Sequence, residues 1–528
     1  MDTFLKNGKI YLGEGRFASS LLIRDGLVAG VDCTPDGARE VDLGGRTVVP
    51  GFIDSHLHMF NTGRALRSVK LHGVDSIREC IALGRRFIEE QQPGSGAVIV
   101  GRGWNDDYFL DEHRMLDRHD LDQVSTDRPV IYTRACGHAL ACNTKALELA
   151  GVTADTAQPE GGRFELGDDG APNGIFKEHA MGMIQKLIAD PDLEEAKAIL
   201  QAAMAHASEN GITSVQTNDL SEQNWPLLWE AYEGLRKEGK STVRSYQQCL
   251  FTTAEGYEDF IKKGFRTGFG DEMNKIGPLK LLIDGSLGAR TSLMRQEFHD
   301  MPGNKGIQVV PDALLDRFMA ISRENDMQVA VHAIGDRGIE LVLDAYQKAL
   351  PEGCGQRRWG IVHCQITDGP LVKRFAEQQV VAMVQPIFLH YDLHMVADRV
   401  GDALASTSYA FGTMDKLSIR NCYGTDSPVE DLNTMNNLYC AVTRRDLTGF
   451  PENGWYPTEC VPVQTAVDHY TADGAWNSFE ETKKGKLLPG YYADLAVLDT
   501  DIFTCDPMAI KDAKVLMTML GGKVVFER

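Results

Sequence analysis

The chain has 528 residues, 43% of them hydrophobic and 24% charged, an ordinary globular composition whose length favours two or three folded units. The formal net charge of −21 disfavours nucleic acid and anionic membranes as partners, because an acidic surface repels phosphate groups. The 11 cysteines are scattered without a Cys-x-x-Cys pair, which argues against a zinc ribbon and suits free thiols in a reducing compartment.

Both ends of the chain are rich in short β-strand patterns. Asp25-Gly26 and Gly521-Gly522 each mark a hairpin turn between two such patterns. Because the termini of compact chains often lie close together, we expect residues 1–50 plus 485–528 to form one small β-sandwich domain. Two unrelated edge hairpins are the alternative.

The N-terminal segment has neither the basic region nor the apolar run of a signal peptide. No stretch approaches the roughly 18 consecutive apolar residues of a membrane span. We therefore expect a cytoplasmic protein with no membrane partner. The oligomeric state is left open, a homodimer being one option.

Between the two ends, residues 51–484 alternate buried-strand patterns with helical patterns, such as those over 194–210 and 311–325. Eight β units alternating with helices predict an α/β fold, specifically a (β/α)8 TIM-like barrel. An open doubly wound sheet is the alternative, but no Gly-x-Gly-x-x-Gly fingerprint follows a strand. The expected strands cover residues 48–56, 211–217, 243–251, 279–285, 328–335, 360–364, 380–386 and 421–426.

The spacing of the early strands is too long for a plain barrel. Only three βα steps separate positions 58 and 280, although a barrel uses roughly 31 residues per step. The surplus falls mainly at about 60–195. We interpret it as an inserted lobe over the barrel mouth, where barrel enzymes vary their loops.

Imidazole and carboxylate groups recur at the predicted C-terminal strand ends. His56 and His58 are two residues apart at the end of the first strand, so both side chains can face one ion. His332 and His363 end the fifth and sixth strands, and Asp426 ends the eighth. One such histidine is usually an ordinary core or surface residue, but residues at this end of a barrel are typically catalytic. The joint pattern predicts a divalent-metal centre.

Lys280 lies inside an apolar run, residues 279–285, where a charged ammonium is penalised by desolvation. A neutral amine at this position can react with carbon dioxide to form a carbamate, an anion able to bridge two cations. The alternative is that Lys280 stays a charged ammonium, paired with Asp284 or exposed to solvent. The local sequence pattern alone favours this alternative.

Several motifs in a fixed order resemble the amidohydrolase superfamily, in particular the branch of N-substituted formamide deformylase. They are GFIDSHLH, LKLLIDGSLGAR, VHAIGDRG, IVHCQ and GTDSPVE, and RGWNDD, GHALACNTKAL and LLPGYYADLAVLD extend the similarity over nearly the whole chain. The resemblance implies that His56 and His58 hold one metal. Carboxylated Lys280 would bridge it to a second metal held by His332 and His363.

The resemblance also implies that Asp426 binds the first metal and acts as general base. A divalent ion lowers the pKa of bound water to about 7 and polarises a carbonyl. We therefore expect hydrolysis of a carbon–nitrogen bond in a small-molecule amide, N-formyl or N-acyl amine, or cyclic amide. Zinc suits imidazole-rich ligation, with manganese, iron and cobalt as alternatives. The alternative functions are a deaminase, an esterase or lactonase, and a non-catalytic regulatory protein.

Three further residues are candidate substrate contacts. Trp104 and His138 lie in the expected lobe and match positions that recur in the resembled family, although a packing anchor is an equal interpretation of Trp104. Gln385 ends the predicted seventh strand, where its amide could donate a hydrogen bond to substrate.

Overall fold

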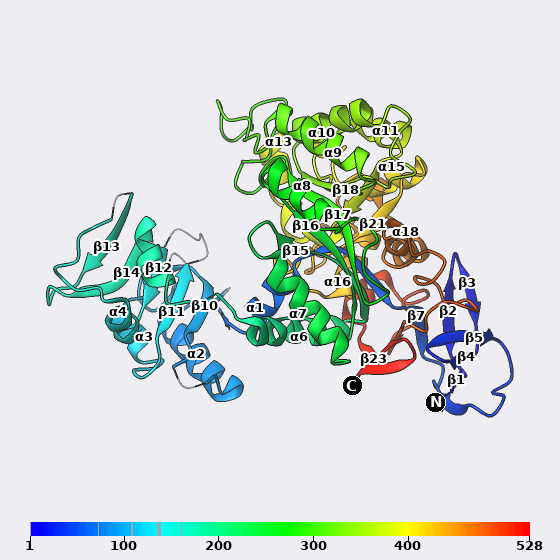
Figure 1. Cartoon of the computed structure of the whole chain (residues 1–528), viewed down its shortest axis with the longest axis horizontal. Helices are drawn as coiled ribbons and strands as arrows, with labels where there is room; N and C mark the ends of the chain where they lie inside the picture. The colour runs from blue at the N-terminus through cyan, green and yellow to red at the C-terminus, as the bar shows by residue number, and fades with distance from the viewer. Residues whose placement is uncertain are drawn as a thin grey trace. The chain divides into compact units, whose positions relative to one another are not determined.

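The computed structural model describes residues 2–71, 73–94, 96–106, 109–134, 139–159, 161–188 and 190–528. The described residues divide into two compact units (Figure 1). One unit comprises the chain up to Asn61 together with Ala203–Arg528, and the other comprises Thr62–Ala202. The chain passes from one unit to the other within α1 (Met59–Leu66) and again within α6 (Leu193–Glu209).

The first unit is built around an eight-stranded parallel sheet whose strands follow one another in chain order. They are β8 (Phe52–Leu57), β15 (Ile212–Ser221), β16 (Arg244–Leu250), β17 (Asn274–Leu282), β18 (Val329–Ala333), β19 (Gly360–His363), β20 (Val381–Val384) and β21 (Asn421–Tyr423). The chain beyond β21 returns to β8, where the His58 N–H donates to Ser427 O and the Asp426 N–H donates to His56 O, both at 2.8 Å. The sheet forms a nearly closed barrel, which confirms the predicted (β/α)8 fold.

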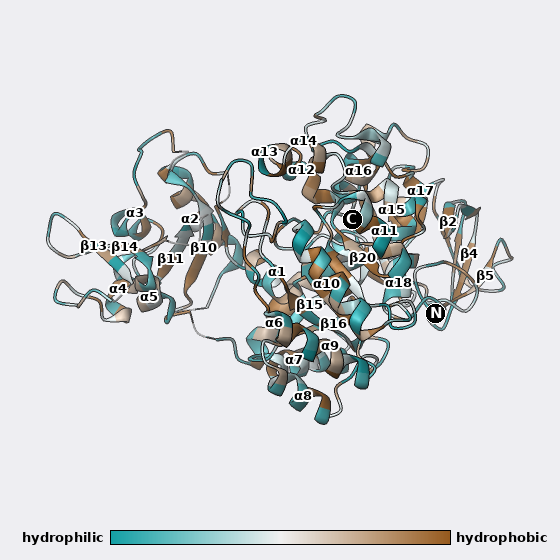
Figure 2. Ribbon diagram, turned by 90° about the horizontal axis from the view of Figure 1, so that it is seen from above, coloured by the Kyte–Doolittle hydropathy of each residue, from teal (hydrophilic) through white to brown (hydrophobic). Residues whose placement is uncertain are grey.

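Helices cover the outer face of the barrel strands (Figure 1). In α10 (Asp336–Ala349), the buried residues Ile339, Val342, Leu343 and Tyr346 recur with the helical period and form one apolar stripe. Figure 2 shows apolar colour on the strands and polar colour on outward helix faces. The other helices are α7 (Trp225–Lys237), α8 (Ala254–Lys262), α9 (Asp312–Glu324), α11 (Gly369–Gln378), α12 (Leu389–Asp392), α13 (Val396–Val400), α14 (Asp402–Ala405), α15 (Phe411–Lys416), α16 (Thr434–Thr443), α17 (Val463–His469) and α18 (Ala472–Asn477). Short 3-10 turns are η3 (Pro386–Phe388), η4 (Pro457–Glu459) and η5 (Pro507–Asp512).

The strand expected over residues 48–56 is divided at Gly51. β7 (Thr47–Pro50) joins a second sheet, and β8 begins the barrel. The backbone changes partners here, because the Gly51 N–H donates to Asp494 O and the Phe52 N–H donates to Gly211 O. A Cβ on Gly51 would lie 2.1 Å from Thr213 Oγ1, so only glycine fits this close crossing.

Strands from both chain termini pair in a six-stranded sheet of order β24-β23-β22-β7-β2-β3. Next to it lies a four-stranded sheet of order β5-β4-β1-β6, and one apolar cluster contains Leu5, Val48, Leu495 and Met519 from the two sheets. The β-sandwich and its boundaries, 1–50 plus 485–528, stay predictions. The strands are β1 (Thr3–Lys6), β2 (Lys9–Gly13), β3 (Arg16–Ala18), β4 (Leu21–Arg24), β5 (Leu27–Val31), β6 (Arg39–Asp42), β22 (Leu495–Leu498), β23 (Val515–Leu520) and β24 (Lys523–Glu527).

The second unit, Thr62–Ala202, contains its own six-stranded sheet of order β13-β14-β12-β11-β10-β9. The expected lobe, about 60–195, overlaps this unit, and its place over the barrel mouth stays a prediction. Its elements are β9 (Val69–Lys70), α2 (Ile77–Gln91), β10 (Ile99–Trp104), α3 (Arg118–Asp122), β11 (Val130–Arg134), β12 (Ala139–Cys142), α4 (Thr144–Ala150), β13 (Gly162–Leu166), β14 (Pro172–Glu178), η2 (His179–Met181) and α5 (Gly182–Gln185). No helix in the described part of the chain has the length and apolar character needed to cross a lipid bilayer.

Candidate metal centre

The predicted histidine and aspartate ligands lie at the C-terminal ends of barrel strands. His56 lies on β8 and His58 directly follows it, while His332 lies on β18 and His363 is the last residue of β19. Asp426 comes shortly after β21. Because parallel strands of a barrel end at the same rim, all five side chains start from one rim.

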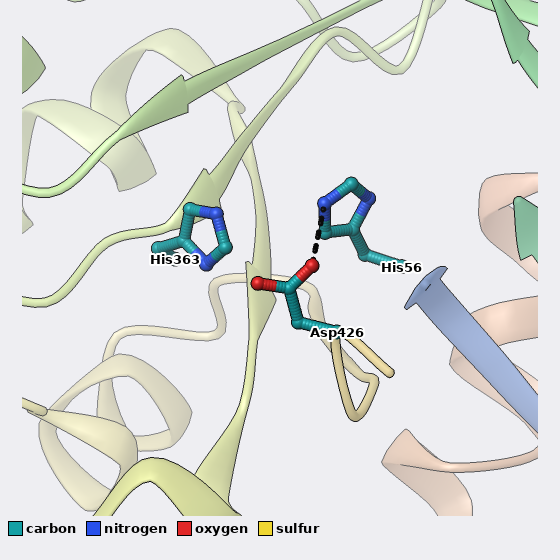
Figure 3. A group of neighbouring side chains, drawn as sticks. All are labelled: His56, His363 and Asp426. Carbon is teal, nitrogen blue, oxygen red and sulfur yellow. Dashed lines mark ion pairs between the residues drawn. The ribbon is translucent and has the colours of Figure 1, made fainter. Parts of the chain in front are cut away.

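His56, His363 and Asp426 form the centre of this group (Figure 3). Their potential ligand atoms lie within 4.8 Å of one another, and all three residues are buried. Asp426 Oδ1 lies 3.4 Å from His56 Nε2 and 3.3 Å from His58 Nε2. The His332 ring adjoins that of His363, with centroids 4.5 Å apart. The structure thus brings the four histidines and Asp426 together.

In two of these histidines, Nδ1 lies within hydrogen-bond distance of an oxygen that can only accept a hydrogen bond. Nδ1 of His56 lies 2.8 Å from Gln248 Oε1, and Nδ1 of His58 lies 3.0 Å from the carbonyl oxygen of Asn218. Each Nδ1 must therefore carry the ring proton. The Nε2 atoms of His56 and His58 then face Asp426 Oδ1, at 3.4 Å and 3.3 Å, on the side where a metal-binding histidine offers its ligand atom.

The other two rings are held in the same way. Nδ1 of His363 lies 2.8 Å from Gln385 Oε1, so Nε2 of His363 is the unprotonated atom. Nε2 of His332 lies 3.1 Å from the carbonyl oxygen of Gly285, which leaves Nδ1 of His332 unprotonated. All four rings are therefore held in orientation by an acceptor at one ring nitrogen.

The protonation states of the side chains at the rim are those that favour a bound cation. Burial lowers the pKa of His363 to about 3, and burial with the positive charge of Lys280 lowers the pKa of His56 well below its usual value. Burial opposes ionisation of Asp426, but the contact with His58 at 3.3 Å and the nearby imidazoles hold its pKa far below the ordinary range. Burial opposes protonation of His58, but the same contact with Asp426 raises the pKa of His58. The neutral imidazoles of His56 and His363 and the ionised carboxylate of Asp426 are the forms that a divalent metal requires.

Asp426 Oδ1 is buried and has no hydrogen-bond partner among the described residues. An unsatisfied buried acceptor costs about 1–3 kcal/mol unless something outside the protein chain satisfies it. His363 (φ 79°) and Asp426 (φ 58°) also hold left-handed backbone conformations, which are strained for these residues and typical of functional sites. The orphaned oxygen and the imidazole donors together fit a divalent cation.

Lys280 lies on β17 and is 2% exposed. Its Nζ makes no hydrogen bond or ion pair within the described part of the chain. Burial lowers its pKa to about 8, although the charge of Asp426 acts in the opposite direction. Asp284, the alternative partner, instead accepts hydrogen bonds from the N–H groups of Ile334 and Gly335. A neutral amine is therefore accessible to Lys280 near physiological pH.

Trp104 does not have the position expected of a substrate contact. It is fully buried in the core of the unit Thr62–Ala202, where it stacks on Phe109 and donates from Nε1 to Tyr132 O at 3.1 Å. With its ring covered and its N–H satisfied, Trp104 is a packing anchor. His138 lies outside the described residues.

Gln385 is also engaged within the protein rather than free for substrate. It is 2% exposed, its Oε1 receives the Nδ1–H of His363 at 2.8 Å, and its Nε2 donates to Met383 O at 3.2 Å. The expected hydrogen bond to substrate is thus replaced by support of His363, because the side chain turns along the rim toward the neighbouring strand.

Sequence reasoning missed the residues that hold the ligands in place. Gln248 orients His56 and donates from Nε2 to Ser55 O at 3.0 Å. Asp54 accepts hydrogen bonds from the N–H groups of His56 and Thr425, which ties the segment before Asp426 to β8. A signal was present, because each polar side chain interrupts an apolar strand pattern, where its burial is costly without a partner.

The amidohydrolase family model matches residues 39–526 of the chain. The chain is 31% identical to the putative amidohydrolase YtcJ of Bacillus subtilis (strain 168), over 100% of both sequences. It is 25% identical to the N-substituted formamide deformylase of Arthrobacter pascens, over 100% of this chain and 98% of that enzyme. The crystal structure of an uncharacterized metal-dependent hydrolase from Pyrococcus horikoshii OT3 matches with a TM-score of 0.78 and 27% identity, over 96% of this chain and 99% of that chain.

These similarities extend over the same segments as the motifs that suggested the family. The barrel, the convergent ligands and the related metal-dependent hydrolase support a divalent metal at the rim. The predicted enzyme class, a hydrolase of carbon–nitrogen bonds, is confirmed by the family match. The chain therefore belongs to the amidohydrolase family and is a hydrolase of that family.

Proposed function

We propose that the chain hydrolyses a carbon–nitrogen bond in a small-molecule amide, N-formyl or N-acyl amine, or cyclic amide. One observation carries the proposal: the ligand atoms of His56, His363 and Asp426 converge within 4.8 Å, and Asp426 Oδ1 has no hydrogen-bond partner among the described residues. The similarity to a relative named N-substituted formamide deformylase supports the choice of an amide-type bond.

The ring nitrogens that do not face a backbone or glutamine oxygen indicate which residues would hold the metal. One potential set is Nε2 of His56 and of His58 with Oδ1 of Asp426, and a second is Nε2 of His363 with Nδ1 of His332. Zinc is our choice of metal, because imidazole nitrogen is among its preferred ligands. When bound, such a cation lowers the pKa of water to about 7 and polarises the carbonyl under attack.

Lys280 completes the arrangement as a carbamate. Its neutral amine would attack carbon dioxide: one nitrogen–carbon bond forms, one carbon–oxygen π bond of carbon dioxide breaks, and the nitrogen loses one proton to water. The product is an anion with two oxygens. Such an anion on Lys280 would offset the repulsion between two cations held by the histidines and Asp426. The buried Nζ supports this role, because an ammonium there would have no ion-pair partner among the described residues.

Asp426 transfers the proton in the reaction. Its ionised carboxylate accepts a proton from the water that attacks the carbonyl carbon, and a tetrahedral carbon results. The carbon–nitrogen bond then breaks, and the carboxyl group delivers the proton to the leaving nitrogen. His58, 3.3 Å from Asp426 Oδ1, and the strained backbone at Asp426 hold this carboxylate in place.

Metal analysis combined with a substrate panel tests the proposal. Protein prepared without chelator is assayed against N-formyl amines, N-acyl amines, cyclic ureas, amino heterocycles and esters, with chelated protein as control. We expect amide hydrolysis that chelation removes and zinc restores. Turnover confined to esters or to ring amines would replace the proposal with an esterase or a deaminase, and failure to take up any metal would overturn it.

A further inference from the structure

A second group of polar side chains lies next to the metal ligands in the chain. Gln365 follows His363 by two residues, Asp392 ends α12 after the seventh barrel strand, and Glu430 follows Asp426 by four residues. We propose that Gln365, Asp392 and Glu430 form a recognition site for a protonated amine carried by the substrate. This inference rests on the proposed hydrolysis and deepens it by naming the chemical class of substrate.

The side-chain amide oxygen of Gln365 lacks a hydrogen-bond donor. Its side chain is 3% exposed and turns toward Asp392, because Nε2 donates to Asp392 Oδ2 at 3.3 Å. Its other amide atom, Oε1, is buried and has no hydrogen-bond partner among the described residues. A buried carbonyl oxygen without a donor is costly, so Oε1 of Gln365 points to a donor supplied by a ligand.

Asp392 offers a second free acceptor. Its Oδ2 is occupied by the Tyr409 hydroxyl at 2.5 Å and by Gln365, whereas Oδ1 has no partner within the described chain. Burial raises the pKa of Asp392 to about 6, although the hydrogen bond from Tyr409 acts in the opposite direction. No lysine, arginine or histidine of the described residues forms an ion pair with Asp392. Its negative charge is therefore left uncompensated.

Glu430 offers a third acceptor and shares the same electrostatic field. It makes no hydrogen bond or ion pair within the part of the chain that the structure describes. Burial, followed by the negative charges of Asp392, Asp431 and Asp426, raises its pKa to about 8. A metal would compensate Asp426 but not Asp392, so the negative charge of Asp392 would still act on Glu430. A positive charge here would be attracted by both groups.

The free atoms match an ammonium group in number and kind. The unpaired oxygens of Gln365 and Asp392 are acceptors, and a bound cation would favour the ionised form of Glu430, which is also only an acceptor. An alkylammonium carries three N–H donors and no acceptor. Charged hydrogen bonds of this kind are about twice as strong as neutral ones. A calcium ion is a poorer match, because it takes roughly 6–8 oxygen ligands.

The site borders the metal ligands, so one substrate can reach both. Phe388 immediately precedes α12, which Asp392 ends, and its ring stacks on that of His363 with centroids 5.9 Å apart. Gln365 and Glu430 are close in sequence to His363 and Asp426 respectively. A substrate whose amide lies at the metal ligands can therefore extend an ammonium-bearing arm toward Asp392 and Glu430.

Matched substrates test the inference. Each pair contains an N-formyl or N-acetyl diaminoalkane with a free ammonium and the same amide with a terminal methyl group instead, over chains of three to six carbons. We expect kcat/KM of the wild type to favour an ammonium compound by roughly 10- to 100-fold, the range of one or two charged hydrogen bonds. Glu430→Gln and Asp392→Asn should lower that ratio toward one, whereas Glu352→Gln, on the exposed Glu352, should keep the wild-type ratio. A wild-type ratio near one, or an unchanged ratio in both site variants, would overturn the inference.

A binding measurement separates this inference from the proposed function. Calorimetry follows 1,5-diaminopentane, 1-pentanol and calcium chloride added to metal-loaded protein. Saturable diamine binding that weakens roughly tenfold or more in Glu430→Gln would support the site even if no amide is hydrolysed, in which case only the proposed function fails. Absence of diamine binding, equal binding in Glu430→Gln, or displacement of the diamine by calcium would overturn the ammonium site.

Discussion

Asp284 Oδ1 lies 3.4 Å from Nε2 of His332, and the same carboxylate accepts hydrogen bonds from the N–H groups of Leu293, Ile334 and Gly335. The carboxylate thus holds both the His332 ring and the backbone that follows it. A Cβ on Gly338 would lie 2.8 Å from Asp284 Oδ2, so this packing leaves little room. Support of a ligand from outside the ligand set is common in metal sites.

Asp284→Asn should therefore weaken metal binding. The substitution removes the negative charge and turns an amide N–H₂ group toward backbone N–H donors, which displaces His332. We expect metal affinity to fall roughly 10- to 100-fold, as for other supporting residues. Chelator competition measures the affinity, and thermal unfolding checks the fold. Asp155→Asn, at an exposed position, is the control. Wild-type affinity in folded Asp284→Asn protein would contradict the role of Asp284.

Asp426→Asn should retain the fold and lose nearly all turnover. Asparagine has almost the same shape and keeps one oxygen near His56 and His58, but it cannot accept the proton of the attacking water. We expect kcat to fall about 10²- to 10⁴-fold, the usual effect of losing a general base. Steady-state kinetics at saturating metal measures the loss, and turnover close to wild type would refute the assignment.

Lys280→Ala should reduce the metal content from two ions toward one. The wild type should lose metal on acid dialysis, because acid decomposes a carbamate, and recover it best when bicarbonate accompanies the metal. A short carboxylic acid should partly restore the second ion in Lys280→Ala. Elemental analysis gives the metal count. A single ion with full activity in the wild type, beside an unmodified amine in a crystal structure, would make Lys280 an ordinary pocket lysine.

Deletion of the last forty residues should give insoluble protein. It removes β22, β23 and β24, and thereby exposes the edge of β7, where Val48 and Val49 are buried. Deletion of only 523–528 removes the edge strand β24, whose residues are largely exposed, and should be tolerated. The soluble fraction after expression measures both. A soluble and fully active form of the longer truncation would count against a domain shared by the two termini.

The contribution of His469 to the free energy of unfolding should fall as the pH rises above neutrality. Burial disfavours the charged ring, but hydrogen bonds to Asp415 at 2.8 Å and Asp473 at 2.7 Å outweigh it and raise the pKa of His469 to about 9. The folded state thus holds this proton more tightly than the unfolded state, whose histidine has a pKa of about 6.5. The contribution to stability is complete below pH about 6.5 and is lost as the pH rises through about 9.

Urea unfolding at several pH values tests this, with His469→Asn as the variant and His113→Gln, at an exposed position, as the control. The difference in unfolding free energy between wild type and His469→Asn should shrink from pH 6 to pH 9.5. The control should follow the wild type throughout. A constant difference over this range would show that His469 is neutral in the folded protein.

The order of the barrel strands could be predicted because each strand has a local signature. Apolar runs bounded by turn residues recur between helical patterns, and every predicted strand corresponds to one of the eight strands of the barrel. The break at Gly51 could not be predicted in this way. It depends on the approach of Thr213, which is distant in the sequence, and an unbroken apolar run carries no sign of a change of sheet.

The candidate ligands could be predicted for a related reason. His56, His332, His363 and Asp426 come at or just after strand ends, and position in a parallel barrel follows directly from position along a strand. Trp104 and Gln385 show the limit of that argument. The residues that surround each of them come from other parts of the chain. Those residues bury Trp104 and place His363 next to Gln385.

The sequence by itself determined the fold class, the strand order and the kinds of side chain at the rim, because these depend on periodicity and on distance from a strand end. Only the tertiary structure decided which nitrogen of each candidate ligand histidine meets an acceptor oxygen. That choice depends on acceptors such as Gln248, which lies 192 positions from His56 in the chain and 2.8 Å from it in the fold. Among the described residues it also left Oε1 of Gln365 and Oδ1 of Asp426 without hydrogen-bond partners. Hydrogen bonds reach only about 3 Å, so their pattern is set by which distant segments pack together and not by the order of residues along the chain.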